Sequence, residues 1–160
     1  MTSLASGSLS STSLSLSSIS SSYENLQLWL MDMDFSSASD LDMTFNSLTA
    51  NYTMAVLGRG ATYSISDGQP STNKVRLKYN LESILDGDYN ANLVINFYNY
   101  ASSGTKIGDW KLYWYARFGG NQHIVEGIFN NSSANSAVDS ITITSAASWS
   151  AGTYKLWGIK

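Results

Sequence analysis

Short runs of alternating apolar and polar residues, separated by turn-forming clusters, constrain this chain more than any other feature. Residues 41–45 and 75–79 place an apolar side chain at every second position, the pattern of a strand with one buried face. Residues 26–31 carry large apolar groups on both faces, so we expect both sides of that strand to be covered. Strands are predicted at 8–18, 26–31, 41–45, 52–56, 75–79, 93–100, 111–118, 124–129, 138–144 and 154–159.

Clusters rich in Gly, Asn, Asp and Ser lie between these runs, and such residues accept left-handed backbone or form Asx turns. The main clusters are at 58–60, 67–70, 86–88, 103–104, 119–121 and 130–133. The best helical candidate, 79–85, would make at most two turns. The sequence therefore predicts an all-β fold: an antiparallel, jelly-roll-like β-sandwich of about ten strands with little or no helix.

The first 22 residues are rich in Ser, a composition typical of a flexible linker. The alternation of Leu14, Ser15 and Leu16 nevertheless predicts a half-buried strand. A Ser-rich terminus stays ordered only when a sheet or a neighbouring chain holds it. We therefore expect residues 1–22 to form an N-terminal arm and first strand that belong to the same unit as a single β-sandwich domain over 8–160.

Composition excludes several classes of protein. Only 13% of the residues are charged while 12% are aromatic, which argues against disorder. A net charge of −3 argues against nucleic-acid binding, which needs clustered Lys and Arg. The absence of Cys excludes disulfides and Cys-ligated zinc. No apolar run approaches the ~20 residues that span a bilayer. We therefore expect no membrane partner and, from the charge, no nucleic-acid partner.

The single histidine, His123, is a weak candidate for catalysis. No G-x-S-x-G nucleophile elbow accompanies it, and one histidine cannot build a multi-histidine metal site. An ordinary position in a loop or at a strand edge explains it better. We expect a protein that is not an enzyme and that uses no cofactor.

Four acidic residues, Asp32, Asp34, Asp40 and Asp42, surround the predicted turn at 35–39. Such oxygens can hold Ca²⁺, and paired carboxylates can hydrolyse glycosides. Each pair has i, i+2 spacing and so shares one face of its strand, which is equally typical of a solvated face that discourages edge pairing. We treat these residues as weak metal candidates and predict no metal site.

Lys74, Arg76 and Lys78 form the one basic row of the sequence. Strand alternation places all three on the polar side of 75–79, where they either face water or contact an acidic protein surface. We include them among the candidate interface residues.

Aromatic residues are concentrated between positions 110 and 118. Alternation places Leu112 and Trp114 on one face of this strand and Tyr113 and Tyr115 on the other. The core must claim at least one of the two faces. The other face is then either a platform for glycan or a contact between protein chains, since Tyr and Trp serve as anchors in both.

Several segments of the sequence resemble a family of small virion proteins of tailed phages. The resemblance covers most of the chain. It rests on ASGSL at 5–9, the alternating strand after it, ISSSYENL at 19–26, FN and NY at 45–46 and 51–52, INFYNYA at 95–101 and WSAGTYKLWGIK at 149–160. Trp149 and Trp157 stand where Phe and Tyr are expected, which keeps the aromatic bulk.

The resemblance implies a jelly-roll capsid decoration (cement) protein that forms a homotrimer on the outer surface of the phage head, binds the major capsid protein and stabilises contacts between capsomers. It implies synthesis in the host cytoplasm and carries over no catalytic residues. The N-terminal arm, with Leu4 and Leu9, is expected at the contact with the capsid. The alternative is a tail- or fibre-associated module that binds host glycan through Tyr113 and Tyr115.

Overall fold

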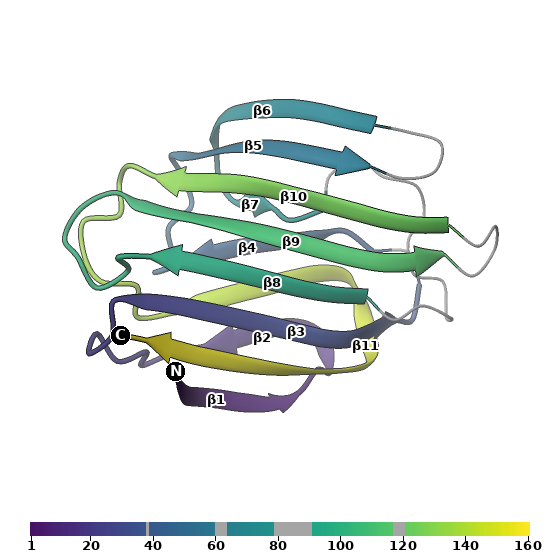
Figure 1. Ribbon diagram of the computed structural model, residues 1–160, viewed down its shortest axis with the longest axis horizontal. Coiled ribbons are helices and arrows are strands. Elements are labelled where there is room, and N and C mark those ends of the chain that lie inside the picture. The colour runs from purple at the N-terminus through teal and green to yellow at the C-terminus, as the bar shows by residue number, and fades with distance from the viewer. Residues whose placement is uncertain (38, 60–63, 79–90, 117–120) are drawn as a thin grey trace.

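The computed structural model describes residues 1–37, 39–59, 64–78, 91–116 and 121–160, in which eleven strands and no helix occur (Figure 1). All strand pairings are antiparallel. This confirms the prediction of an all-β antiparallel sandwich, whereas the helical candidate 79–85 lies outside the described residues. The strands are β1 (Thr2–Ser8), β2 (Ser11–Leu16), β3 (Asn25–Phe35), β4 (Leu41–Phe45), β5 (Tyr52–Arg59), β6 (Ser64–Thr72), β7 (Val75–Arg76), β8 (Ala91–Tyr98), β9 (Lys106–Ala116), β10 (Asn121–Asn131) and β11 (Ile141–Ile159).

The strands form two layers that share β11 (Figure 1). The front layer has the order β6-β5-β10-β9-β8-β3-β11-β1, and the back layer has the order β7-β4-β11-β2. Residues 141–145 of β11 pair with β4 in the back layer, and residues 153–159 pair with β1 and β3 in the front layer. A single strand, β11, therefore closes the sandwich on the side where it passes from the back layer to the front layer.

The bend in β11 lies between residues 144 and 153, where its pairing with β2 and β3 shifts register. Gly152 has φ of +128°, a backbone conformation that L side chains rarely adopt. Trp149 is buried in the bend and packs against Phe35 with ring centroids 5.9 Å apart. The sequence predicted two strands, at 138–144 and 154–159, and this was wrong because small residues let a single strand turn the corner.

The core between the layers is organised around Phe45 of β4. Its ring lies 5.2 Å from that of Tyr52 and 5.5 Å from that of Phe97 in the front layer, both edge-on. The hydroxyl of Tyr52 accepts a hydrogen bond from the Phe45 backbone N–H (3.0 Å) and donates to the Leu48 carbonyl (3.2 Å). Burial raises the pKa of Tyr52, which stays a neutral hydrogen-bonding group in the core.

The Ser-rich terminus forms two strands instead of the one predicted at 8–18, and both β1 and β2 pair with β11. Leu9, between them, is only 5% exposed, and its N–H donates to the Gly152 carbonyl (2.9 Å). Leu4 is half-buried against the core. The sheet itself therefore holds the terminus in place.

Two further segments differ from the sequence prediction. The predicted turn at 67–70 lies inside β6, where Gly68 pairs with Ala55 of β5. The predicted strand at 75–79 is strand only over Val75–Arg76, after which Leu77 and Lys78 are both buried. Alternation thus ends at Arg76, and Lys78 does not share the exposed side of Lys74 and Arg76.

The crowded backbone at Gly108 provides a test of the front layer. A Cβ at this position would lie 2.2 Å from the Asn96 carbonyl oxygen and 2.4 Å from the Phe129 ring. Gly108→Ala is expected to lower the free energy of unfolding by about 1–3 kcal/mol, because overpacking displaces backbone. Urea denaturation measures this change in the free energy of unfolding. Gly104→Ala, whose Cβ would meet nothing closer than 3.9 Å, is the control; equal stability of the two variants would contradict the packing described.

Candidate binding face of the front layer

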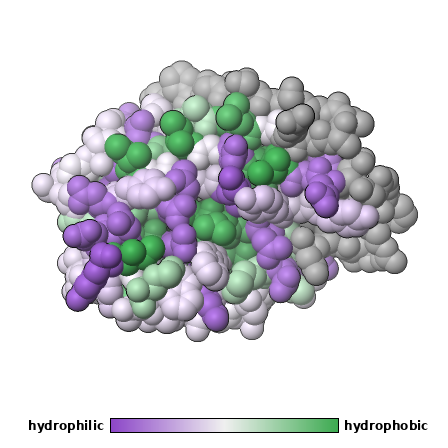
Figure 2. Space-filling model, in the orientation of Figure 1, coloured by the Kyte–Doolittle hydropathy of each residue, from purple (hydrophilic) through white to green (hydrophobic). Residues whose placement is uncertain are grey.

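The outer face of the front layer, formed by β5, β10, β9, β8 and β3, carries the largest group of exposed apolar and aromatic side chains among the described residues. Figure 2 views this face and shows apolar patches between hydrophilic ones. The exposed large side chains here are Leu57, Tyr98, Ile107, Tyr113, Tyr115 and Ile128, which are 44–62% exposed. No strand of the described chain covers them. We call this surface the outer face.

Alternation along β9 builds the centre of this face. Leu112 and Trp114 point into the core and are at most 5% exposed, whereas Tyr113 and Tyr115 are 44% and 51% exposed. The sequence prediction for these four residues is confirmed. The outward-facing side chains of β9 lie in one line and are Ile107, Asp109, Lys111, Tyr113 and Tyr115. At about 3.4 Å per residue, the part from Asp109 to Tyr115 is about 20 Å long.

Cross-strand register brings a polar network to the middle of the outer face. Asn96 lies opposite Gln27 on one side and Asp109 on the other. Gln27 Nε2 donates to Asn96 Oδ1 (2.8 Å), and Asn96 Nδ2 donates to Asp109 Oδ1 (2.7 Å). The Tyr98 hydroxyl donates to Asp109 Oδ2. Three strands thereby fix the direction of a half-buried carboxylate and two half-buried amides.

An ion pair lies in the next row of the outer face. Lys111 Nζ is 2.8 Å from Glu126 Oε2, and both side chains are more than 40% exposed. The hydrogen bond with Glu126, supported by Tyr113, raises the pKa of Lys111. Solvent screens a pair this exposed, so its contribution to stability is small. Its effect is to orient two charged groups beside the apolar side chains.

A shallow hollow of about 520 Å³ lies between β5, β10 and β9. Apolar groups of Leu57 and Ile128 line it together with the carboxylate of Asp109. This volume is within the range of about 300–1,000 Å³ that small-molecule sites occupy. The full lining is Ala55, Val56, Leu57, Asp109, Trp110, Lys111, Glu126, Gly127 and Ile128.

Two half-buried indoles border the outer face on the side of β11. Trp29 and Trp157 meet edge-on with ring centroids 5.9 Å apart. The ammonium of Lys155 lies 5.8 Å from the Trp157 ring centroid, a cation–π arrangement. The sequence predicted that both faces of residues 26–31 are covered, but the face of β3 that carries Trp29 is only half-buried.

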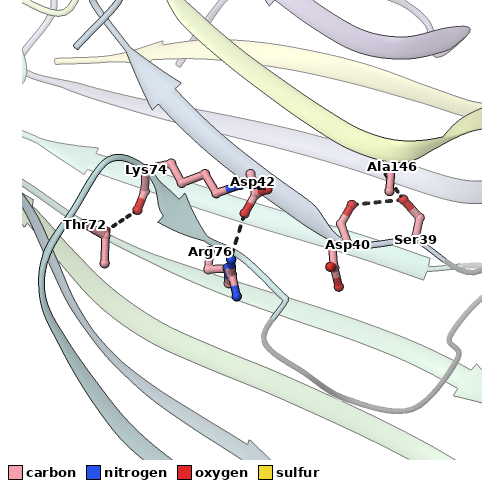
Figure 3. Close-up of polar contacts among 7 residues, drawn as sticks. All are labelled: Ser39, Asp40, Asp42, Thr72, Lys74, Arg76 and Ala146. Carbon is pink, nitrogen blue, oxygen red and sulfur yellow. Dashed lines mark hydrogen bonds and ion pairs between the residues drawn. The ribbon is translucent and has the colours of Figure 1, made fainter. Parts of the chain in front are cut away.

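The acidic residues are spread over both layers, and Figure 3 shows two of them, Asp40 and Asp42, which lie at β4 in the back layer. Asp32 and Asp34 lie on β3, and Asp34 Oδ1 accepts a hydrogen bond from the Phe35 N–H (2.9 Å). Asp42, on β4, is paired with Lys74 (2.6 Å) and Arg76 (3.8 Å). In the part of the chain that the structure describes, no three acidic or histidine side chains gather in a group that could hold a metal ion.

Lys74 and Arg76 therefore neutralise Asp42 and do not form a free basic stripe. Lys78 is 3% exposed, and its ammonium donates to the Ser39 carbonyl. Burial lowers the pKa of Lys78, an effect that the nearby Asp40 partly opposes. The predicted row of three exposed cations was wrong for Lys78, because its chain leaves the strand after Arg76 and turns inward.

His123 stacks on Trp114, with ring centroids 4.9 Å apart and planes within 4° of parallel. It lies opposite Trp114 in the β9–β10 register, on the core-facing side of the sheet. The sequence favoured a loop or strand-edge position for it, whereas the structure places it within β10, which lies between β5 and β9.

The sequence matches no protein-family model, and no curated protein matches it. Among solved structures, it is similar to the CBM2 module of the evolved Dit of Lactobacillus casei BL23 phage J-1. The likeness covers 92% of this chain and 69% of that one, with 10% sequence identity and a TM-score of 0.29. A likeness of this size assigns neither a family nor a function. In the described residues, no helix has the length and apolar character needed to cross a membrane.

The hydrogen bond from Tyr98 to Asp109 gives a test of the polar network. It is the main cause that raises the pKa of Tyr98 to about 12. We expect one tyrosine to ionise near this value in a titration followed by phenolate absorbance. Asp109→Asn should move that step toward the usual value of about 10, because a neutral amide stabilises the phenol less than a carboxylate does. Because folding raises its pKa, Tyr98 stabilises the fold below about pH 10, and this contribution is lost as the pH rises through about 12.

Tyr98→Phe should remove one tyrosine from the late part of the titration, which assigns that step to this residue, while Tyr52 and Tyr100, whose pKa values burial also raises, continue to ionise late. An unchanged titration in both variants would show that the hydrogen bond is absent in solution.

Proposed function

We propose that this chain is a non-catalytic binding module of a phage particle, associated with the tail or a fibre, and that it binds an oligosaccharide through the outer face. The observation that carries the proposal is the pair Tyr113 and Tyr115, exposed on the face of β9 that also carries the hydrogen-bonded Asp109, four residues before Tyr113. The sequence resemblance to phage virion proteins supplies the setting.

The two tyrosines offer the apolar part of such a site. Both lie on the same face of β9, about 7 Å apart, so their rings can contact successive units of an extended ligand. A Tyr ring combines a large apolar face with a polar hydroxyl and has few torsions to immobilise. These properties suit a ligand such as a sugar ring, which has apolar C–H faces and polar edges.

The polar groups on the same face offer the hydrogen-bonding part of such a site, which would give it specificity. Gln27, Asn96 and Asp109 are already oriented by hydrogen bonds to one another. Because these groups are fixed before a ligand arrives, binding loses less side-chain entropy. Carboxylate and amide oxygens that keep free lone pairs can accept hydrogen bonds from ligand hydroxyls.

The hollow continues the line of β9 away from the tyrosines. Lys111, which lines it, is two residues from Tyr113 on the same side of the strand. A ligand that contacts Tyr115, Tyr113 and the hollow in turn would follow β9 for about 20 Å. This geometry favours an oligosaccharide over a single sugar.

Replacing the tyrosines tests the proposal. Tyr113→Ala and Tyr115→Ala are each expected to weaken binding at least tenfold, because truncating an aromatic anchor removes more than about 1.4 kcal/mol. Binding is measured on an array of bacterial surface glycans, then by calorimetry with the best ligand, and on whole host cells. Urea denaturation should show that both variants stay folded.

Tyr113→Phe and Tyr115→Phe keep the rings and are the matched controls, which should retain most of the affinity. If the wild-type chain binds no glycan and no host cell, or if the Ala variants bind as well as the wild type, the proposal fails.

A second candidate, the capsid decoration protein, is favoured by a different observation on the same face. Leu57, Ile107 and Ile128 are more than half exposed, and apolar groups of this size are typical anchors of protein contacts. In this case the outer face would lie against the major capsid protein, and a homotrimer would bind through three contacts at once, which strengthens binding by avidity.

The double variant Leu57→Ser/Ile128→Ser tests this candidate. It should lose binding to expanded phage heads in a co-sedimentation assay while Tyr113→Ala retains it. Wild-type chain that stays in the supernatant at all concentrations would exclude the decoration function.

A further inference from the structure

The four edge strands of the two layers are protected to very different degrees. The edges are β6 and β1 in the front layer and β7 and β2 in the back layer. Each of them pairs with one neighbour within the described residues, so one side of its backbone is left for other partners. Natural proteins usually protect such edges with charged residues, with proline or by keeping the strand short.

Two of these edges have such protection. Strand β7 is two residues long, contains Arg76 and follows Lys74, and both cations pair with Asp42. Strand β6 contains Asp67 and the single proline of the chain, Pro70, which lacks a backbone N–H donor. Another strand would pair poorly with either edge.

The other two edges, β1 and β2, lack such protection. Strands β1 and β2 have no charged residue and no proline, and the first charged side chain in the sequence is Glu24. One register shift interrupts β1 at Leu4, after which residues 5–8 pair regularly with β11. Residues 13–16 of β2 also pair regularly with β11. Both strands can therefore accept a further antiparallel strand.

Both unprotected edges lie on the same side of the sandwich (Figure 1). They are consecutive in the chain and are joined through Leu9, which is buried and whose N–H donates to the Gly152 carbonyl (2.9 Å). The bend of β11 thus holds the front edge and the back edge at a fixed spacing. An occupant that matches both edges must itself present two strands at that spacing.

We propose that a second copy of this chain docks on this edge, with β1 antiparallel to the partner's β1 and β2 antiparallel to the partner's β2 about a two-fold axis. A second copy presents the same two edges at the same spacing, so both layers continue across the contact, whereas a single extended peptide would extend only one. A two-fold contact is self-complementary, and the lack of charged side chains over residues 1–23 reduces like-charge repulsion. Backbone hydrogen bonds between added strands supply the affinity.

This proposal stands apart from the glycan site. The two-fold axis runs across the layers, so both outer faces of the dimer point the same way and stay exposed. Two copies would then bind a glycan-coated surface together, with the increase in avidity that linked sites give.

Charge added to the edge tests the proposal. Light scattering of the wild type should give twice 17.4 kDa at high concentration. Ser6→Lys/Ser8→Lys, which places charge at two exposed positions of β1, should give 17.4 kDa with unchanged circular dichroism and unchanged affinity for monovalent glycan. Ser103→Lys/Ser132→Lys, at exposed loop positions, is the matched control and should stay dimeric.

Spin labels give a second readout that does not depend on disrupting the contact. The native chain has no cysteine, so a label on Ser6→Cys reports on a single position. In the dimer, two such labels lie close together across β1 and should broaden each other's spectrum strongly. Labels on Leu57→Cys, on β5 near the opposite edge, should show no broadening. A wild-type monomer at all concentrations, a trimer, or a dimer whose Ser6 labels show no broadening would overturn the proposal.

Discussion

The pairing of β11 with both layers is the interaction on which the rest of the structure depends. A two-layer sheet without a shared strand is held together only by side-chain packing, whereas here backbone hydrogen bonds cross from one layer to the other within a single strand. The bend that makes this possible needs Gly152 in a left-handed conformation and Trp149 in the corner. Strands β1 and β2, which alone have too little apolar surface to fold, are ordered because β11 pairs with them.

Because the inner surface of the front layer is buried in the core, its outer face needs no covering element. The outer face combines exposed apolar groups with polar groups that satisfy one another, such as Asn96 and Asp109. Within this network each side chain finds a hydrogen-bond partner on a neighbouring strand. Side chains that hold one another in this way lose less conformational entropy when they form further contacts.

Local pattern predicted the strands whose two faces differ. Residues 41–45 and 93–98 alternate because one face is buried, and the placement of Tyr113 followed from the same rule. Strand β1 was missed because a Ser-rich segment has little contrast between its faces, and β6 was missed because it contains turn-forming residues. In both cases pairing with a neighbouring strand, which a local pattern does not contain, decided the structure.

In the candidate site, too, the local sequence pattern predicted some features while strand pairing decided the others. The exposed tyrosines belong to one strand and could be found by counting along it, whereas in the network of Gln27, Asn96 and Asp109 the first two residues are 69 positions apart in the sequence. Only the register of β3, β8 and β9 brings them together. Lys78 was misplaced for a related reason: alternation describes a strand but does not reveal where the strand stops.

The pairing of Thr2 with Gly158 has a mechanical consequence. The two ends of the chain lie next to each other at one end of the β1–β11 ladder (Figure 1), so tension applied between them would open this ladder one hydrogen bond at a time. Strands loaded in this direction yield at low force, unlike strands pulled lengthwise past each other. A load that enters and leaves through the termini would peel β1 away first, while the front and back layers stayed closed around the bend of β11.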